Sequence, residues 1–147
     1  MVILGVDPGQ RRVGLAISDD EASLAFPLET VERTSLLAVL SRIAAITEER
    51  EVRHIVVGFP LRLDGTRGGA ARRAEAFAKQ VAERTGLEVE LWDERFTTAS
   101  AEESLRRGGV PGRRRRELVD QAAAALILQS YLDARSERSQ NVGPADQ

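Results

Sequence analysis

The stretch that decides the fold is VILGVDPGQRRVG, residues 2–14. Its apolar start is typical of a strand, and Asp7 ends that strand where Pro8 and Gly9 begin a turn. Gly9 leaves backbone amides free to approach a phosphate group, and a second strand resumes at Val13. The stretch therefore fits two interpretations, a carboxylate presented for chemistry or an ordinary acidic hairpin turn.

Strands and helices alternate after this hairpin. We expect strands over 2–6, 13–17, 24–31, 54–59 and 87–93, and helices over about 34–51, 70–85, 97–107 and 115–134. Thr34 or Ser35 can cap the first helix, and Gly86 can end the second. The first three strands can form an antiparallel meander, and the last two must return through helices and lie parallel to the first. This pattern predicts one α/β domain over 1–135 and a disordered tail over 136–147.

Two further acidic residues stand where they could meet Asp7. Glu94 ends the fifth strand, and we choose it over Asp93 because it shares a side of that strand with Trp92. Open α/β sheets bind their ligands at the carboxyl ends of parallel strands, where Asp7 and Glu94 would both lie. Asp120 falls on an otherwise apolar helical face, so a buried carboxylate there needs a partner, either a cation or a nearby arginine.

Three carboxylates in one place repel one another unless a cation lies between them. The chain has no cysteine and a single histidine, which leaves oxygen ligands for a metal and favours Mg²⁺ or Mn²⁺ over Zn²⁺. Hydrolysis of phosphodiesters by a metal pair needs such an acidic group. We therefore expect Asp7, Glu94 and Asp120 to be catalytic and to hold one or two Mg²⁺ or Mn²⁺ ions.

The bulk composition points to one cytoplasmic domain. The chain has 147 residues and a net charge of −2, so it lacks the global basic field of many nucleic-acid-binding proteins. No stretch is apolar enough to span a bilayer, and no targeting segment precedes the first strand, so we expect no membrane partner.

Positive charge is nearly all arginine, since Lys79 is the one lysine, and it is concentrated over 106–116. A GC-rich genome would explain arginine over lysine but not this local run. Arginine grips phosphate in a two-pronged geometry, although a solvated basic run is the alternative. We expect nucleic-acid contacts from the arginines of this run and from two nearer the acidic residues: Arg12, Arg95, Arg107, Arg113, Arg114, Arg115 and Arg116.

Taken together, these residues resemble the YqgF/RuvX family, Holliday-junction-resolvase-like proteins that are also described as pre-16S rRNA nucleases. The resemblance covers the chain to about Leu132, and four segments in the right order carry it: residues 7–14, 58–66, 93–98 and 120–128. It implies an RNase H-like fold, a five-stranded mixed sheet of order 3-2-1-4-5 with helices on both faces. It also implies that Asp7, Glu94 and Asp120 occupy the acidic triad positions. Glu117 departs from the family, which often carries lysine shortly before the last aspartate.

The resemblance implies a metal-dependent nuclease that processes the 5′ end of pre-16S rRNA in ribosome biogenesis. A Holliday-junction or branched-DNA resolvase in recombination and repair is the alternative, so the expected partner is precursor rRNA or branched or single-stranded DNA. We expect a monomer or a homodimer.

Two other hypotheses stay open. A phosphate-transferring enzyme of the sugar-kinase and actin type shares the Asp-x-Gly turn but needs two such domains. An inactive nucleic-acid-binding module would not need all three carboxylates.

Overall fold

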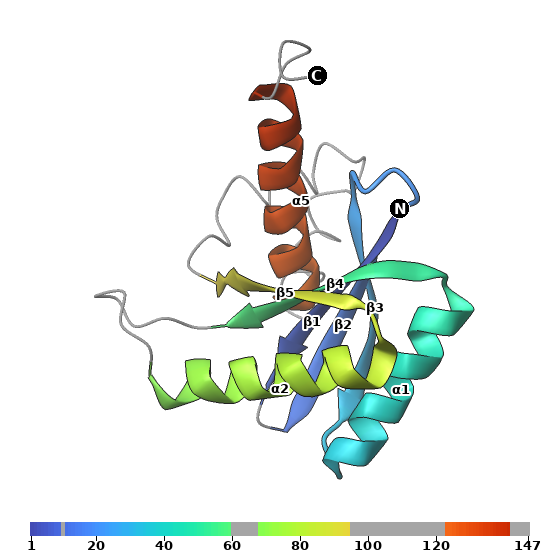
Figure 1. The fold of residues 1–147 in the computed structure, drawn as a ribbon, viewed down its shortest axis with the longest axis vertical. Coiled ribbons are helices and arrows are strands. Elements are labelled where there is room, and N and C mark those ends of the chain that lie inside the picture. Colours follow the sequence, from blue (N-terminus) through green and yellow to red (C-terminus); the bar gives the residue numbers. More distant parts are fainter. Residues whose placement is uncertain (10, 60–67, 95–122, 142–147) are drawn as a thin grey trace, which may run out of the picture.

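The computed structural model describes residues 1–9, 11–59, 68–94 and 123–141 (Figure 1). The chain opens with three strands, and helices and strands then alternate. In chain order the elements are β1 (Val2–Pro8), β2 (Arg12–Ser18), β3 (Ala25–Glu32), α1 (Leu36–Glu49), β4 (Val52–Phe59), α2 (Gly69–Thr85), β5 (Glu88–Asp93) and α5 (Ala123–Asn141).

The five strands form one mixed sheet in the order β3-β2-β1-β4-β5. The first three strands pair antiparallel, and β4 and β5 join β1 in parallel. This confirms the predicted meander, the two parallel returns and the strand order that the family resemblance implied. β1 and β5, which lead to Asp7 and Glu94, therefore run in the same direction with only β4 between them.

One face of the sheet is covered by α1 and α2, which lie together across it in Figure 1. Side chains such as Leu4, Leu15 and Ile55 point from the sheet into this layer and meet Ile43 of α1 and Phe77 of α2. All five are at most 2% exposed. Alternation of side chains along the strands makes this the larger apolar core.

The other face of the sheet is covered by α5. Its core is built largely from small residues, with Ala16 and Ala25 of the sheet against Ala124 and Ala125 of the helix. Small side chains let a helix approach a sheet closely, and this approach brings the start of α5 over β1 and β2.

The helix ends agree with the sequence in two places and differ in one. Ser35 caps α1 by accepting a hydrogen bond from the backbone N–H of Ala38 at 3.1 Å. Gly86 ends α2 in the left-handed region, with φ of 71°, as predicted. The last helix, however, runs to Asn141, seven residues beyond its predicted end at about residue 134. No glycine or proline interrupts residues 135–141, so neither of the two strongest helix breakers ends the helix earlier.

Several predictions lie outside the described residues. These are the helix over 97–107, most of the glycine-rich loop over 64–69, the start of the last helix before Ala123, and the tail over 142–147.

Candidate functional site

Asp7 lies near the end of β1, at the tight turn into β2. It pairs with Gly14 in the antiparallel register, and the backbone N–H of Gly9 donates to its carbonyl at 3.0 Å. A Cβ on Gly9 would lie 2.5 Å from the carbonyl oxygen of Arg12, so only glycine fits this turn. The sequence therefore holds the Asp7 carboxylate at the carboxyl end of the central strand.

Glu94 directly follows β5 and lies on the face of the sheet that α5 covers. A Cβ on Gly58 would meet Ile127 of α5 at 2.6 Å and Oε1 of Glu94 at 3.3 Å, which places the carboxylate beside that glycine. Trp92 is on the same face, because its Nε1 donates to Ser130 Oγ of α5 at 3.1 Å. The alternation that favoured Glu94 over Asp93 therefore holds at the strand end.

The carboxyl groups of Asp7 and Glu94 form a hydrogen bond with each other. Burial, the negative charge of Asp7 and this hydrogen bond raise the pKa of Glu94 to about 7, with a smaller contribution from Asp93. Burial also raises the pKa of Asp7, although the hydrogen bond from Glu94 opposes that rise. Two half-buried acids that share a proton near neutral pH are a site that a cation can occupy in the proton's place.

Glycines set the distance between α5 and the carboxylate pair. A Cβ on Gly5 would lie only 2.8 Å from Cβ of Leu128, and one on Gly14 would lie 3.5 Å from Cβ of Ala124 and 3.7 Å from Cβ of Asp7. The bare backbone of Gly5 lets α5 approach β1, and the contact with Ala124 at Gly14 places the first described turn of α5 against β2. The helix start is therefore next to Asp7.

A polar cluster attaches β5 to α5 below Glu94. Glu90 accepts a hydrogen bond from the Tyr131 hydroxyl at 2.8 Å, and its Oε2 lies 3.1 Å from His54 Nε2. Tyr131 also meets Trp92 edge-on, with ring centroids 5.4 Å apart. His54 and Trp92 both lie inside this partly buried cluster. The cluster fixes the end of β5 from which Glu94 projects.

Two arginines flank the turn after Asp7. Arg12, which was predicted to contact nucleic acid, is exposed at the start of β2 and forms an ion pair with Glu32 at 3.2 Å. Arg33 was missed by the sequence analysis. Its Nη1 donates to the carbonyl of Gly9 at 2.8 Å, and its guanidinium lies 5.6 Å from the ring centroid of Phe77. No local pattern marks Arg33, because both of its contacts are distant in the sequence.

The remaining predicted site residues lie outside the described part of the chain. They are Asp120, Arg95, Arg107, Arg113, Arg114, Arg115 and Arg116. Within the ranges that the structure describes, no three acidic, histidine or cysteine side chains form a group that could hold a metal. Of the predicted triad, the structure thus brings Asp7 and Glu94 together, and Asp120 precedes the first described residue of α5 by three positions.

No helix within the described residues is both long and apolar enough to cross a membrane.

The sheet order and the position of the acidic pair define the class of protein, an RNase H-like α/β chain with the fold of RuvC. The structure of T. thermophilus RuvC in complex with Holliday junction substrate superposes with a TM-score of 0.58 at 20% identity, covering 92% of this chain and 96% of that one. A second Thermus thermophilus RuvC structure gives a TM-score of 0.61 at 17% identity, covering 93% and 97%.

Sequence comparison identifies the family. The model described as "RuvX: Holliday junction resolvase" matches residues 1–134, and the chain belongs to this family. A relative from Myxococcus xanthus (strain DK1622), named "Putative pre-16S rRNA nuclease", is 42% identical over 99% of this chain and 97% of its own length. Relatives of the same name from Syntrophus aciditrophicus (strain SB) and Anaeromyxobacter sp. (strain Fw109-5) are 47% and 48% identical, over 93% and 92% of this chain and 91% and 98% of theirs.

Proposed function

We propose that this chain is a metal-dependent nuclease that hydrolyses phosphodiester bonds at the 5′ end of precursor 16S rRNA. The observation that carries the proposal is the hydrogen-bonded pair of Asp7 and Glu94 at the carboxyl ends of two parallel strands. Structural ion pairs join opposite charges, whereas two acids in contact favour a bound cation or proton chemistry.

The residues present fit a hard divalent cation. Asp7 and Glu94 offer only oxygen atoms, the ligands that Mg²⁺ and Mn²⁺ prefer, and the chain has no cysteine and one histidine to offer instead. Asp120 would be the third ligand, because it lies three residues before Ala123 at the start of α5. When bound, one or two such ions would supply a water that ionises near neutral pH and positive charge at the departing oxygen.

The chain's own residues have three tasks in this reaction. Asp7 and Glu94 release their shared proton and so become a doubly negative site at neutral pH. Gly58 adds no side chain beside the Glu94 carboxylate, which lets Ile127 of α5 and this carboxylate lie close to β4. Arg33 holds the turn after Asp7 through the Gly9 carbonyl, and so keeps the end of β1 in place.

The arginines would bind the substrate backbone. Arg12 is exposed at the turn end of β2 and can exchange its ion pair with Glu32 for a phosphate. Arg95 and the arginines of the run over 106–116 would hold phosphates further along the strand. Each phosphate that they neutralise releases counterions, so binding should weaken as salt rises.

The named relatives support precursor rRNA as the substrate, and processing of that RNA would take place in the cytoplasm. Resolution of Holliday junctions is the second candidate, because the matching family model carries that description. A resolvase cuts two symmetric strands and needs a dimer with two sites facing one junction. A protein that stays monomeric in solution and on DNA would favour RNA processing.

A cleavage panel tests the proposal. The purified protein is incubated with Mg²⁺ or Mn²⁺ and with precursor rRNA leader, single-stranded RNA, single-stranded DNA or a four-way junction. Asp7→Asn keeps the size of the side chain and removes its charge, so cleavage should fall at least about 1000-fold while the fold persists. Asp20→Asn is the matched control, because Asp20 is exposed in the turn after β2.

Cleavage that needs the metal, is lost in Asp7→Asn and persists in Asp20→Asn would support the nuclease. Full activity of Asp7→Asn would show that the carboxylate pair does not carry the reaction. Faster cleavage of the four-way junction than of precursor rRNA, by a protein that forms a dimer, would support the resolvase instead.

A further inference from the structure

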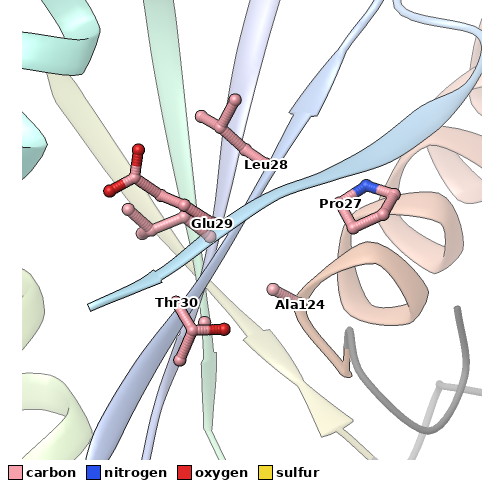
Figure 2. Close-up of a pocket in the computed structure, with 7 residues that line it drawn as sticks. Pro27, Leu28, Glu29, Thr30 and Ala124 are labelled. Atoms are coloured by element: carbon pink, nitrogen blue, oxygen red, sulfur yellow. The ribbon is translucent and has the colours of Figure 1, made fainter. Parts of the chain in front are cut away.

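A pocket of about 190 Å³ lies between the edge strand β3 and the start of α5, one strand away from Asp7 (Figure 2). Seven residues line it: Gly14, Leu15, Pro27, Leu28, Glu29, Thr30 and Ala124. The sequence analysis gave none of them a role, although Gly14 ends the segment 7–14 that carries the family resemblance.

The strand pairing places the pocket in line with Asp7. Gly14 pairs with Asp7 on β1 and with Thr30 on β3, so these three residues form one row across the sheet and face α5. Neighbouring strands lie about 5 Å apart, so Thr30 is about 10 Å from Asp7. Among the described residues, the backbone of Gly14 lies between Asp7 and the pocket.

A β-bulge in β3 opens the pocket. Leu15 pairs with Glu29 and Ala16 pairs with Pro27, so Leu28 is an extra residue in the edge strand. In a regular strand Pro27 and Glu29 would share a face. The bulge instead turns Leu28 and Glu29 toward α1, and it puts Pro27 and Thr30, three residues apart, on the face of α5.

The bulge also removes negative charge from the pocket. Both carboxylate oxygens of Glu29 accept hydrogen bonds from Arg42 of α1, at 2.7 and 2.9 Å. Figure 2 shows the Glu29 carboxylate pointing away from Ala124. The groups that face the pocket are then the strand backbone at its base, the ring of Pro27, the methyl group of Ala124 and the hydroxyl of Thr30. The pocket thus has a mixed polar and apolar lining whose one carboxylate, that of Glu29, is paired with Arg42, and such a lining accepts a flat polar ring or a sugar.

We propose that this pocket binds the nucleoside next to the scissile phosphate, with Pro27 and Ala124 against the base and Thr30 at its polar edge. The inference rests on the proposed nuclease function. The pocket is large enough for one nucleoside. Because Gly14 connects the pocket to Asp7, this nucleoside is the one next to the phosphate that is cleaved. Arg12 lies two residues from Gly14 on the same side of β2, where it can hold the next phosphate.

The test combines a change in the pocket with a change in the substrate. Thr30→Trp fills the pocket, and Thr34→Trp, an equal change at an exposed position beyond β3, is the matched control. A short RNA with one mapped cleavage position is compared with versions that carry an abasic ribose at each neighbouring position in turn. Mn²⁺ affinity is measured by calorimetry on each protein.

Thr30→Trp should lower kcat/KM on the intact RNA at least about tenfold and leave Mn²⁺ affinity unchanged. On the RNA that lacks the base proposed to occupy the pocket, kcat/KM of the wild type should itself be low. On this RNA Thr30→Trp should change kcat/KM by less than about twofold. Thr34→Trp should behave as the wild type. Pro27→Ala, which removes the ring without adding bulk, should lower kcat/KM about threefold on the intact RNA only.

Equal losses on intact and abasic RNA, or no loss in either pocket variant, would overturn the inference while leaving the nuclease in place. Absence of cleavage and of Mn²⁺ binding by the wild type would instead refute the proposed function itself. If Thr30→Trp does not fold, as judged by circular dichroism, the test is the kcat/KM of Pro27→Ala on the intact RNA compared with that on the abasic RNA.

Discussion

The two faces of the sheet differ in what their side chains do. The face under α1 and α2 is filled by leucine, isoleucine and valine that are almost completely buried. The face under α5 combines alanine and glycine with a few larger residues, and it also buries polar groups such as Gln129, Ser130 and His54. Both acids of the candidate site project on the α5 side.

This division separates stability from chemistry. Bulky apolar residues provide most of the free energy of folding, and they need no particular position for any polar atom. Small residues provide less, but they let α5 approach the strand ends from which Asp7 and Glu94 project. Substitutions on the first face should therefore change stability alone, and substitutions on the second should also change metal binding.

The largest expected effect on stability is on the α1 and α2 face. Ile43→Ala removes a fully buried side chain from the core and should lower the free energy of unfolding by about 3 kcal/mol, measured by chemical denaturation. Leu37→Ala, on the same helix but 66% exposed, should change it by less than about 0.5 kcal/mol. Mn²⁺ affinity of the folded Ile43→Ala protein should equal that of the wild type, and a weaker affinity would contradict the separation of the two faces.

A smaller effect on stability, joined to an effect on the site, is expected under α5. Gly5→Ala places a Cβ 2.8 Å from Cβ of Leu128, which cannot rotate away, so the helix must move. We expect a loss of about 2 kcal/mol and weaker Mn²⁺ binding. Gly14→Ala meets only ordinary contacts of 3.5 and 3.7 Å and should change stability by less than about 0.5 kcal/mol. Equal behaviour of the two variants would show that the spacing of α5 is not set by Gly5.

The acidic pair should make the metal-free protein less stable as pH rises. The folded pKa of Glu94, about 7, is above its ordinary value of 4.5. The folded state therefore holds the proton more tightly than the unfolded state, and this contribution to stability is complete below pH 4.5 and lost as pH rises through about 7. Glu94→Gln should raise the free energy of unfolding at pH 8 by about 1 kcal/mol, allowing for solvent screening, and leave it nearly unchanged at pH 5.

Thermal denaturation of the metal-free protein at the two pH values measures this difference. Glu21→Gln, at an exposed position in the turn before β3, is the matched control. Because Mn²⁺ competes with the proton, its affinity for the wild type should increase as pH rises through about 7. A metal affinity that is flat over this range would argue against a shared proton.

The smallest expected effect concerns the turn after Asp7. Arg33→Met keeps an apolar stem against Phe77 and removes the hydrogen bond to the Gly9 carbonyl. We expect a loss of stability of about 0.5–1 kcal/mol and a fall in kcat of about threefold with KM unchanged, measured by steady-state cleavage. Arg53→Met, exposed near the start of β4, should leave kcat as it is. Identical values of kcat for the two variants would show that Arg33 has no role in the site.

Local sequence patterns were enough to predict much of the fold of this molecule. The strands, the meander, the parallel returns and both helix caps follow from periodicity and turn residues, and the choice of Glu94 over Asp93 follows from alternation along one strand. The family resemblance added the order of the strands. Asp120 and the arginines over 95–116 stay predictions, because they lie outside the described residues.

What the sequence could not predict depends on contacts between distant elements. The bulge at Leu28 is a property of the pairing between β2 and β3, and nothing in the sequence of β3 alone marks it. Gly5 and Gly58 matter only once α5 lies over them. Arg33 acts through Gly9 and Phe77, which are far from it along the chain.

The bulged edge strand also bears on how copies of this chain can assemble. Pro27 offers no N–H to an incoming strand, and the extra residue disturbs the regular spacing of the hydrogen-bonding groups beside it. At the opposite edge, β5 presents Glu88, whose charge would face a like charge in a symmetric neighbour. Both borders thus discourage continuation of the sheet into another molecule, and edge-to-edge aggregation is disfavoured.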